Sequence, residues 1–482
     1  MRRRWLIIWL SFVALGAHAQ SVTFRTNNIV LEQSFAWARY RALSYAHYGS
    51  DAVGNWYEAA LPNREAFCMR DVSHQAIGAE ILGLGKHNEN MFRKFASNIT
   101  PEKDYCSYWE INRHNKPAPV DYENDKDFWY NLPANFDVLY NAWRLYRWTG
   151  NRVYLDDPAM KKFYALSMNE YVDHWDLGAA EVTTRNRNLH NGSAKRFKTH
   201  RGIPTYNEGG RGETVLGIDL TASLIAAYDA YAKMLIATDE KKQAKAFKEK
   251  EAAERKFLDD FWWDAQRGEY RTIQYADKTF DYFMVGDNQA FLHYALYFDA
   301  LEDSARMRKI VDTYHEKYKG LIIELKSYLP QLFYDYGYTK LASDMIVELC
   351  SPSNKRRDYP ENSFTVIEHI TRGHMGIEPD AVEGKVSTLS RLEASTDWAE
   401  LSRVPALTGR ITVRHNGQLS SSIQNLGDQS FTWRACFYGK HASIQVNGKP
   451  VRSTQTKSYG QDVSYVEVPV AAGATVSALI DQ

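Results

Sequence analysis

The sequence predicts a mainly α-helical protein, an (α/α)6 barrel of six helical hairpins followed by a C-terminal antiparallel β-sandwich. Two observations predict this fold. Between residues 30 and 375, apolar residues recur at helical spacing in segments separated by Gly, Pro, Asn and Asp. From about residue 378 the pattern changes to short stretches in which apolar and polar residues alternate, as is typical of β-strands.

The chain begins with the features of a signal peptide. "MRRR" supplies a positive segment, "WLIIWLSFVALG" an apolar one, and "AHA" a cleavage site before Gln20. We therefore assign residues 1–19 to a signal peptide that is cleaved near Ala19, and expect a periplasmic or secreted protein. The apolar run is too short to remain as a membrane helix, and no other membrane span is predicted.

Twelve helices are expected after the signal peptide, within a barrel domain over residues 20–377. Short turns such as "GLGKHN" (83–88) and "ATDE" (237–240) join several of them and predict antiparallel hairpins. Six hairpins can close into a double ring in which every second helix lies inside. The expected ranges are 30–47, 72–84, 87–98, 127–148, 157–175, 214–236, 239–262, 287–300, 303–318, 324–336, 338–349 and 361–374.

Residues 378–482 form the predicted β-sandwich domain. Segments such as "GRITVRHNGQLSSSIQNLG" and "VSYVEVPVAAGATVSALI" alternate in polarity, and "HNG", "VNG" and "AGA" supply turns. No cluster of acidic residues occurs in this segment. We interpret it as a packing domain, with carbohydrate binding as the alternative.

Composition limits the possible functions. The 59 basic and 59 acidic residues balance, whereas a nucleic-acid-binding protein would carry a basic excess. The 31 Tyr and 13 Trp suit either a large core or platforms on which sugar rings stack, and composition alone favours the core. The four cysteines fit no metal motif, and either free thiols or one disulfide is compatible with their spacing. No metal or cofactor is predicted, and the oligomeric state is not specified.

Acidic residues lie near the starts of the expected inner helices, whose N-termini would share one mouth of the barrel. They are Asp71, Asp121, Asp127, Glu208, Glu213, Asp287, Glu324 and Glu361. At any single position, a helix cap or a favourable contact with the helix dipole is the preferred explanation. Basic and aromatic residues occur in the same segments, which favours a joint site. From these segments we select Arg64, Arg70, His74, Trp109, Tyr206 and Arg357 as substrate-binding candidates.

Two carboxyl groups in one cavity suit the cleavage of a glycosidic bond. One carboxylic acid protonates the leaving oxygen, while the other, ionised, activates water or attacks the anomeric carbon. Neighbouring arginines lower the pKa of one acid, and burial or a second acid raises the pKa of the other. The candidates for such a pair are Glu65, Asp71, Glu208 and Glu361.

The segments "PNRE" (62–65) and "CMRD" (68–71) resemble those of the six-hairpin glycosidases, especially the α-L-rhamnosidase type. That family carries Pro-Gln-Arg-Glu and then Trp-Thr-Gly-Asp at the start of an inner helix. The resemblance implies that Glu65 is the general acid and Asp71 a substrate-binding carboxylate. It also implies that Glu361, in "YPENSF", is the base, with Glu324 and Glu368 as further matches.

The sequence departs from the rhamnosidase pattern where Cys-Met-Arg replaces Trp-Thr-Gly. Related six-hairpin families, including β-glucuronidases, act on uronic acids, and an arginine beside the key acid suits a carboxylated sugar. We therefore expect an exported, exo-acting glycoside hydrolase, inverting in mechanism, whose substrate is a uronate- or rhamnose-containing polysaccharide. The alternatives are a polysaccharide lyase on an α/α toroid and a non-catalytic glycan-binding protein.

Overall fold

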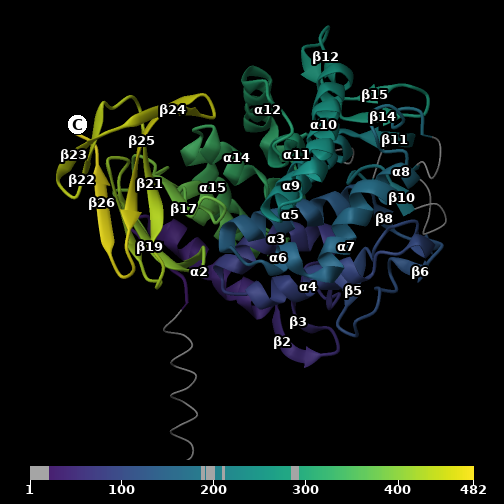
Figure 1. Ribbon diagram of the computed structural model, residues 1–482, viewed down its shortest axis with the longest axis horizontal. Helices are drawn as coiled ribbons and strands as arrows, with labels where there is room; N and C mark the ends of the chain where they lie inside the picture. The colour runs from purple at the N-terminus through teal and green to yellow at the C-terminus, as the bar shows by residue number, and fades with distance from the viewer. Residues whose placement is uncertain (1–20, 186–189, 192–200, 209–211, 284–291, 482) are drawn as a thin grey trace, which may run out of the picture.

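The structure, a computed structural model, describes residues 21–185, 190–191, 201–208, 212–283 and 292–481. The predicted signal peptide and Asp287 lie outside these ranges. Figure 1 shows the helices gathered in one body, with the yellow C-terminal sheets packed against one side of it.

Six helical segments form the inner ring of the barrel. They are α3 (Met69–Ile81), α5 (Pro133–Thr149), α9 (Ile218–Ala237), α11 (His293–Tyr297), α13 (Ile323–Lys326) with α14 (Leu329–Asp335), and α16 (Pro360–Glu368). Each contacts the next, and α16 packs against α3, so the ring is closed. These segments correspond to the second, fourth, sixth, eighth, tenth and twelfth predicted helices. The (α/α)6 barrel is therefore confirmed.

The remaining predicted helices surround this ring. They are α2 (Ile29–Ser44), α4 (Gly85–Ser97), α7 (Pro158–Leu166), α10 (Lys241–Phe257), α12 (Ser304–Lys317) and α15 (Thr339–Cys350). The outer helix α10 packs on α9, α2 packs on α16, and α15 packs on α14. Short helices α6 (Val153–Asp156) and α8 (Val172–His174) complete the connections.

Several predicted helix boundaries were wrong because short strands occupy the ends. The helix expected over 30–47 stops before β2 (Ala46–Asp51), which pairs with β3 (Gly54–Tyr57). The helix expected over 127–148 begins only at Pro133, whose fixed φ suits the first helical turn. The helix expected from 214 is preceded by β11 (Glu213–Gly217), whose sequence "ETVLG" includes β-branched residues.

Small sheets occupy the loops at one end of the barrel. They contain β4 (Ala66–Cys68) with β5 (Glu110–Asn112), β6 (Tyr122–Asn124) with β7 (Asp127–Phe128), β8 (Tyr130–Asn131) with β10 (Arg201–Ile203), and β9 (His190–Asn191), β11, β14 (Ile273–Tyr275) and β15 (Phe280–Asp281). The hairpin of β12 (Trp263–Asp264) and β13 (Glu269–Tyr270) follows α10. In Figure 1 the labels β8, β10, β11 and β14 lie on the side away from the yellow sheets. These strands fix the loops that carry the candidate site.

Two sheets form the C-terminal β region. The first has the order β1-β18-β19-β20-β26-β22-β23 and the second β16-β17-β21-β25-β24. Their strands are β1 (Thr23–Thr26), β16 (Glu378–Asp380), β17 (Lys385–Leu389), β18 (Trp398–Ala406), β19 (Gly409–Asn416), β20 (Ser420–Asn425), β21 (Phe431–Tyr438), β22 (Ser443–Val446), β23 (Lys449–Arg452), β24 (Thr454–Ser458), β25 (Gln461–Val470) and β26 (Thr475–Leu479). All pairs are antiparallel except β17 with β21. The start of the chain joins this region, because β1 pairs with β18.

Buried polar contacts join the barrel to the sheets. The indole of Trp148 donates to the carbonyl of Pro405 over 2.7 Å, and Arg391 lies 2.9 Å from a carboxylate oxygen of Asp335. One helix, α9, is long and apolar enough to cross a membrane, but 78% of that stretch is buried inside the protein. All four cysteines are free thiols.

Candidate active site

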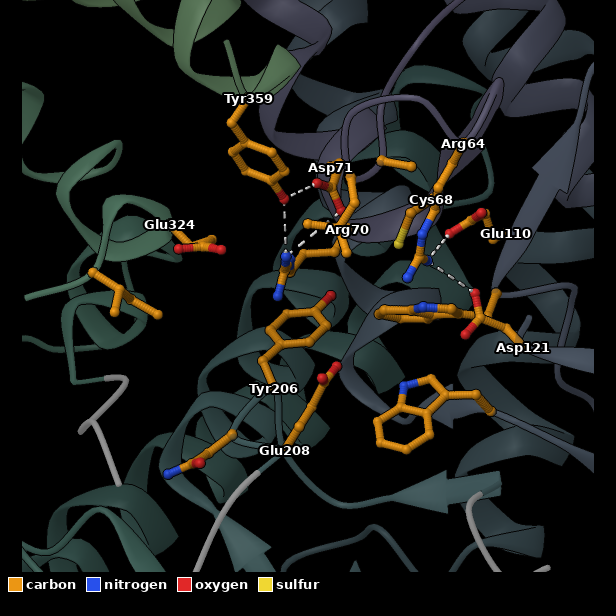
Figure 2. A pocket seen from close by; sticks show the side chains of 16 residues that line it. Arg64, Cys68, Arg70, Asp71, Glu110, Asp121, Tyr206, Glu208, Glu324 and Tyr359 are labelled. Carbon is orange, nitrogen blue, oxygen red and sulfur yellow. Dashed lines mark hydrogen bonds and ion pairs between the residues drawn. The ribbon is translucent and has the colours of Figure 1, made fainter. Parts of the chain in front are cut away.

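A cavity of about 450 Å3 opens at the N-terminal ends of α3 and α16, where the predicted inner-ring mouth lies. Its walls come from the first turn of α3, the residue before α16, strand β5 and the segments before β11 and α13. The lining residues are Ala60, Leu61, Arg64, Cys68, Arg70, Asp71, Trp109, Glu110, Asp121, Trp129, Tyr206, Asn207, Glu208, Ile322, Glu324 and Tyr359. Figure 2 shows acidic side chains directed into this space from several sides.

Asp71 lies in the first turn of α3 and is buried. The hydroxyl of Tyr359 donates a hydrogen bond to its carboxylate, and Arg70 Nη2 lies 3.6 Å from the other carboxylate oxygen. The same guanidinium is 3.4 Å from the Tyr359 hydroxyl (Figure 2). Burial alone would lower the pKa of Arg70, but the negative charge of Asp71 outweighs it and raises this pKa, so the arginine stays charged. Asp71 is thus held by two donors that suit a carboxylate.

A second carboxyl pair lies across the cavity, bridged by Arg64. Pairing of β4 with β5 sets Glu110 opposite Cys68 and brings its side chain to the wall. Arg64 Nη1 lies 2.8 Å from Glu110 and 3.5 Å from Asp121. Burial and the charge of Asp121 raise the pKa of Glu110 to about 8, and burial raises the pKa of Asp121. Because two like charges so close disfavour each other, the pair retains a proton at neutral pH.

Glu208 enters the cavity from the segment before β11 (Figure 2). It is open to solvent through the cavity although the residues around it are buried. Burial in this surrounding raises the pKa of Glu208 to about 7, and the charges of Asp121 and Asp71 add to the rise. Arg70 and a hydrogen bond from Trp129 act in the opposite direction. The carboxyl group therefore holds its proton to higher pH than an ordinary glutamate does.

Aromatic side chains give the cavity a rigid wall. The hydroxyl of Tyr206 donates to Asp137 over 3.0 Å, while its backbone N–H donates to Asp219 over 2.5 Å. The guanidinium of Arg70 lies 5.8 Å from the Tyr206 ring centroid, and the Trp109 ring lies 6.4 Å from it. Flat apolar faces beside carboxylates are suited to sugar rings, which carry both C–H faces and hydroxyl groups.

Glu65 and Arg357, two of the predicted site residues, do not line this cavity. Glu65 adopts a positive φ of 48° and turns its side chain outward, where it is 55% exposed. There Arg113 Nη1 lies 2.5 Å from its carboxylate. Arg357 instead packs its guanidinium 5.4 Å from the ring of Trp37 on α2.

Glu361 and His74 lie beneath the cavity rather than in its wall, and both are almost fully buried. His74 Nε2 is 3.3 Å from a Glu361 carboxylate oxygen, and the Ser327 hydroxyl donates to the same oxygen over 3.0 Å. Burial and the charge of Asp71 raise the pKa of Glu361 well above its usual value. Burial lowers the pKa of His74, whose ring stacks on Tyr328 at 3.4 Å. Burial therefore favours the uncharged form of both groups.

Six of the ten selected site residues meet at the cavity: Arg64, Arg70, Asp71, Trp109, Tyr206 and Glu208. Asp121 and Glu324, two further acids expected at the mouth, line it as well. The structure adds Glu110 and Tyr359, which the sequence analysis missed. Glu110 directly follows the selected Trp109 in "YWE" (108–110), and Tyr359 lies two residues before the selected Glu361 in "YPE" (359–361). Within the described ranges, no group of three or more His, Cys, Asp or Glu residues is arranged to hold a metal ion.

The chain resembles solved structures in fold. An α-L-rhamnosidase from Dictyoglumus thermophilum matches 96% of this chain with a TM-score of 0.60 at 11% identity, and a Streptomyces avermitilis α-L-rhamnosidase complexed with L-rhamnose matches 96% with a TM-score of 0.57 at 13% identity. A putative kojibiose phosphorylase from human microbiome matches 94% with a TM-score of 0.54 at 11% identity. The matches cover 50%, 42% and 68% of those chains, so this chain spans half or less of the two rhamnosidases. No family model and no curated protein sequence matches the chain.

Proposed function

We propose that the protein is a glycoside hydrolase in which Glu208 and Asp71 carry the acid–base chemistry. The observation that carries this proposal is the contrast between these two carboxyl groups in one cavity. Glu208 has a pKa near neutrality, as a proton donor requires, whereas Asp71 is held by Tyr359 and Arg70, as a carboxylate requires. The fold shared with rhamnosidases supports the same reaction class.

In the proposed reaction, Glu208 gives its proton to the glycosidic oxygen as the bond from that oxygen to the anomeric carbon breaks. Asp71 accepts a proton from a water molecule while the water oxygen bonds to the anomeric carbon from the opposite side. The product is a free sugar of inverted configuration, and proton exchange with solvent restores both carboxyl groups. Inversion is part of the proposal and follows from assigning Asp71 to water rather than to direct attack.

We propose an uncharged sugar as the unit that enters the cavity. Five carboxyl groups line it, those of Asp71, Glu110, Asp121, Glu208 and Glu324, against two guanidinium groups among the described residues. Both arginines, Arg64 and Arg70, already pair with acids of this chain. A sugar carboxylate would meet like charges, whereas sugar hydroxyls can donate to these oxygens. The rhamnosidase structure complexed with L-rhamnose, which is uncharged, is compatible with this choice.

We also propose that the predicted signal peptide directs export, which would bring the enzyme to glycans outside the cytoplasm. We propose that the enzyme removes a terminal unit from a polysaccharide. The polysaccharide itself can still carry uronate beyond that unit.

The lyase alternative is less well supported. A lyase needs a basic Tyr or His near a neutralised uronate. Burial raises the pKa values of Tyr206 and Tyr359 well above the usual range, so neither phenol is a base at neutral pH. No histidine is among the described residues that line the cavity.

A screen of aryl glycosides and plant oligosaccharides tests the proposal. It should include rhamnosides, mannosides, glucosides and glucuronides, with the wild type beside Asp71→Asn. We expect release of an uncharged sugar that Asp71→Asn reduces at least about 100-fold without loss of folding. Near-UV absorbance from an unsaturated sugar would identify a lyase instead, and binding without any bond cleavage would identify a glycan-binding protein.

A further inference from the structure

A second pocket adjoins the cavity and differs from it in charge. It measures about 440 Å3 and is formed by residues 321–323, 326, 348 and 353–356. Ile322, which is 43% exposed, lines both spaces. A chain of sugars leaving the cavity over Ile322 would enter this pocket, which we call the basic pocket.

The wall between the two spaces is built from one ion pair and one ring. Glu324 lines the cavity, and Arg356 lines the basic pocket, with Arg356 Nη2 2.5 Å from the Glu324 carboxylate. The guanidinium of Arg356 also lies 5.4 Å from the ring of Tyr359, whose hydroxyl holds Asp71. The basic pocket is therefore directly joined to the proposed catalytic residues.

Positive charge predominates in the basic pocket. Its lining contains Lys326, Lys355 and Arg356 against one carboxylate, that of Glu348. Lys326 lies 2.7 Å from Glu348, and Arg356 is engaged by Glu324. Within the part of the chain that the structure describes, the ammonium group of Lys355 has no hydrogen bond or ion pair with another residue. The pocket thus offers the unpaired charge of Lys355 beside Lys326 and Arg356, which are already paired with acids.

We propose that the basic pocket binds an anionic sugar unit, carboxylated or sulfated, which lies next to the uncharged unit in the cavity. This inference rests on the proposed function for the identity of the neighbouring unit. An anion would be attracted by the positive charge of Lys355. It could also approach Lys326 and Arg356 without meeting an unpaired acid in the lining of this pocket. The acidic cavity and the basic pocket then select an uncharged terminal sugar linked to a charged one.

The test compares disaccharides that differ only in the second unit. The first unit is the sugar found in the aryl glycoside screen, and the second is glucuronate, glucose 6-sulfate or glucose. We expect the wild type to have the higher kcat/KM on a charged disaccharide, and Lys355→Glu to reduce that preference about five- to tenfold. Lys449→Glu, a matched charge reversal on β23, should leave the preference unchanged.

The two proposals fail in different ways. Hydrolysis of all three disaccharides with equal efficiency would overturn the basic pocket and leave the hydrolase proposal intact. A preference for charged disaccharides that persists in Lys355→Glu would have the same meaning. If no glycoside is cleaved, binding decides, measured by NMR titration with methyl β-D-glucuronide and methyl β-D-glucoside. Selective binding of the glucuronide that Lys355→Glu abolishes would support the pocket while the hydrolase proposal fails. Equal binding of both probes would overturn the pocket as well.

Discussion

The Tyr359 hydroxyl donates a hydrogen bond to the Asp71 carboxylate, and the two residues come from opposite ends of the barrel sequence. Asp71 begins the first inner helix, α3, and Tyr359 directly precedes the last, α16. Closure of the ring brings these two helix starts side by side, as the contact between α3 and α16 shows. The fold thereby creates a site that neither segment contains alone.

Replacing Tyr359 by Phe should weaken catalysis without unfolding the protein. The substitution removes one hydrogen bond to a charged group, which is worth about 1.5–3 kcal/mol, so kcat/KM should fall about 10- to 100-fold. Steady-state kinetics and circular dichroism check the two parts. The matched control is Tyr154→Phe, because the buried Tyr154 hydroxyl has no hydrogen-bond partner among the residues that the structure describes. Equal activity of both variants would show that the Tyr359 contact has no role in the reaction.

The pH profile should report the protonation of Glu208. Because the proposed donor is active in its protonated form, the rate should fall as pH rises through about 7. Asp121→Asn removes a charge that raises this pKa, so the alkaline limb should move to lower pH. Asp156→Asn, on the exposed surface, serves as the control. An alkaline limb that stays fixed in Asp121→Asn would contradict the assignment of that limb to Glu208.

Gly78 should be essential for the close approach of α3 and α16. A Cβ atom at this position would lie 2.1 Å from the carbonyl oxygen of Phe364, so Gly78→Ala must push the helices apart. We expect a loss of about 1–3 kcal/mol in the free energy of unfolding. The control is Gly212→Ala, whose added Cβ lies 3.5 Å from the Tyr275 ring, its nearest contact among the described residues. Denaturant unfolding of both variants measures the difference, and equal stability would contradict the tight packing.

The buried carboxyl group of Glu254 should contribute a loss of stability as pH rises from about 5 to 8. Burial raises the pKa of Glu254 to about 7, above its unfolded value of about 4.3. A raised folded-state pKa gives a contribution that is complete below the unfolded pKa and is lost as pH rises through the folded pKa. Glu254→Gln keeps an oxygen for the Ala179 N–H and should reduce this loss by on the order of 2 kcal/mol. Thermal unfolding of the wild type and of Glu254→Gln at pH 5 and pH 8 measures this loss. If the stability of both proteins changes equally with pH, Glu254 is not its cause.

Apolar periodicity was sufficient to predict the helical ring, because each helix buries one face and every second helix buries nearly all of its surface. It could not predict strands of two or three residues, such as β8, since these depend on partners distant in sequence. The alternating pattern beyond residue 378 likewise predicted strands, but it did not predict which strands pair. The pairing of β1 with β18 is one example.

The candidate site was predictable only in part for the same reason. Position at or before the start of an inner helix predicted that Asp71 and Glu208 lie at the mouth, and both line the cavity there. Side-chain direction depends on local backbone and partners that the sequence pattern does not specify. Thus Glu65 turns outward to Arg113, and Glu361 turns inward to Ser327 and His74. The catalytic roles that the family resemblance implies for Glu65 and Glu361 remain predictions.

The central claim is that Glu208, rather than Glu65, donates the proton to the leaving oxygen. The most direct test is the kcat/KM of Glu208→Gln and Glu65→Gln, each measured on an unactivated oligosaccharide and on an aryl glycoside with an acidic leaving group. We predict that Glu208→Gln loses about 10²–10⁴-fold on the oligosaccharide and far less on the aryl glycoside, because a good leaving group needs no proton. Glu65→Gln should match the wild type on both. The opposite result, an intact Glu208→Gln beside a Glu65→Gln that fails only on the oligosaccharide, would contradict the account.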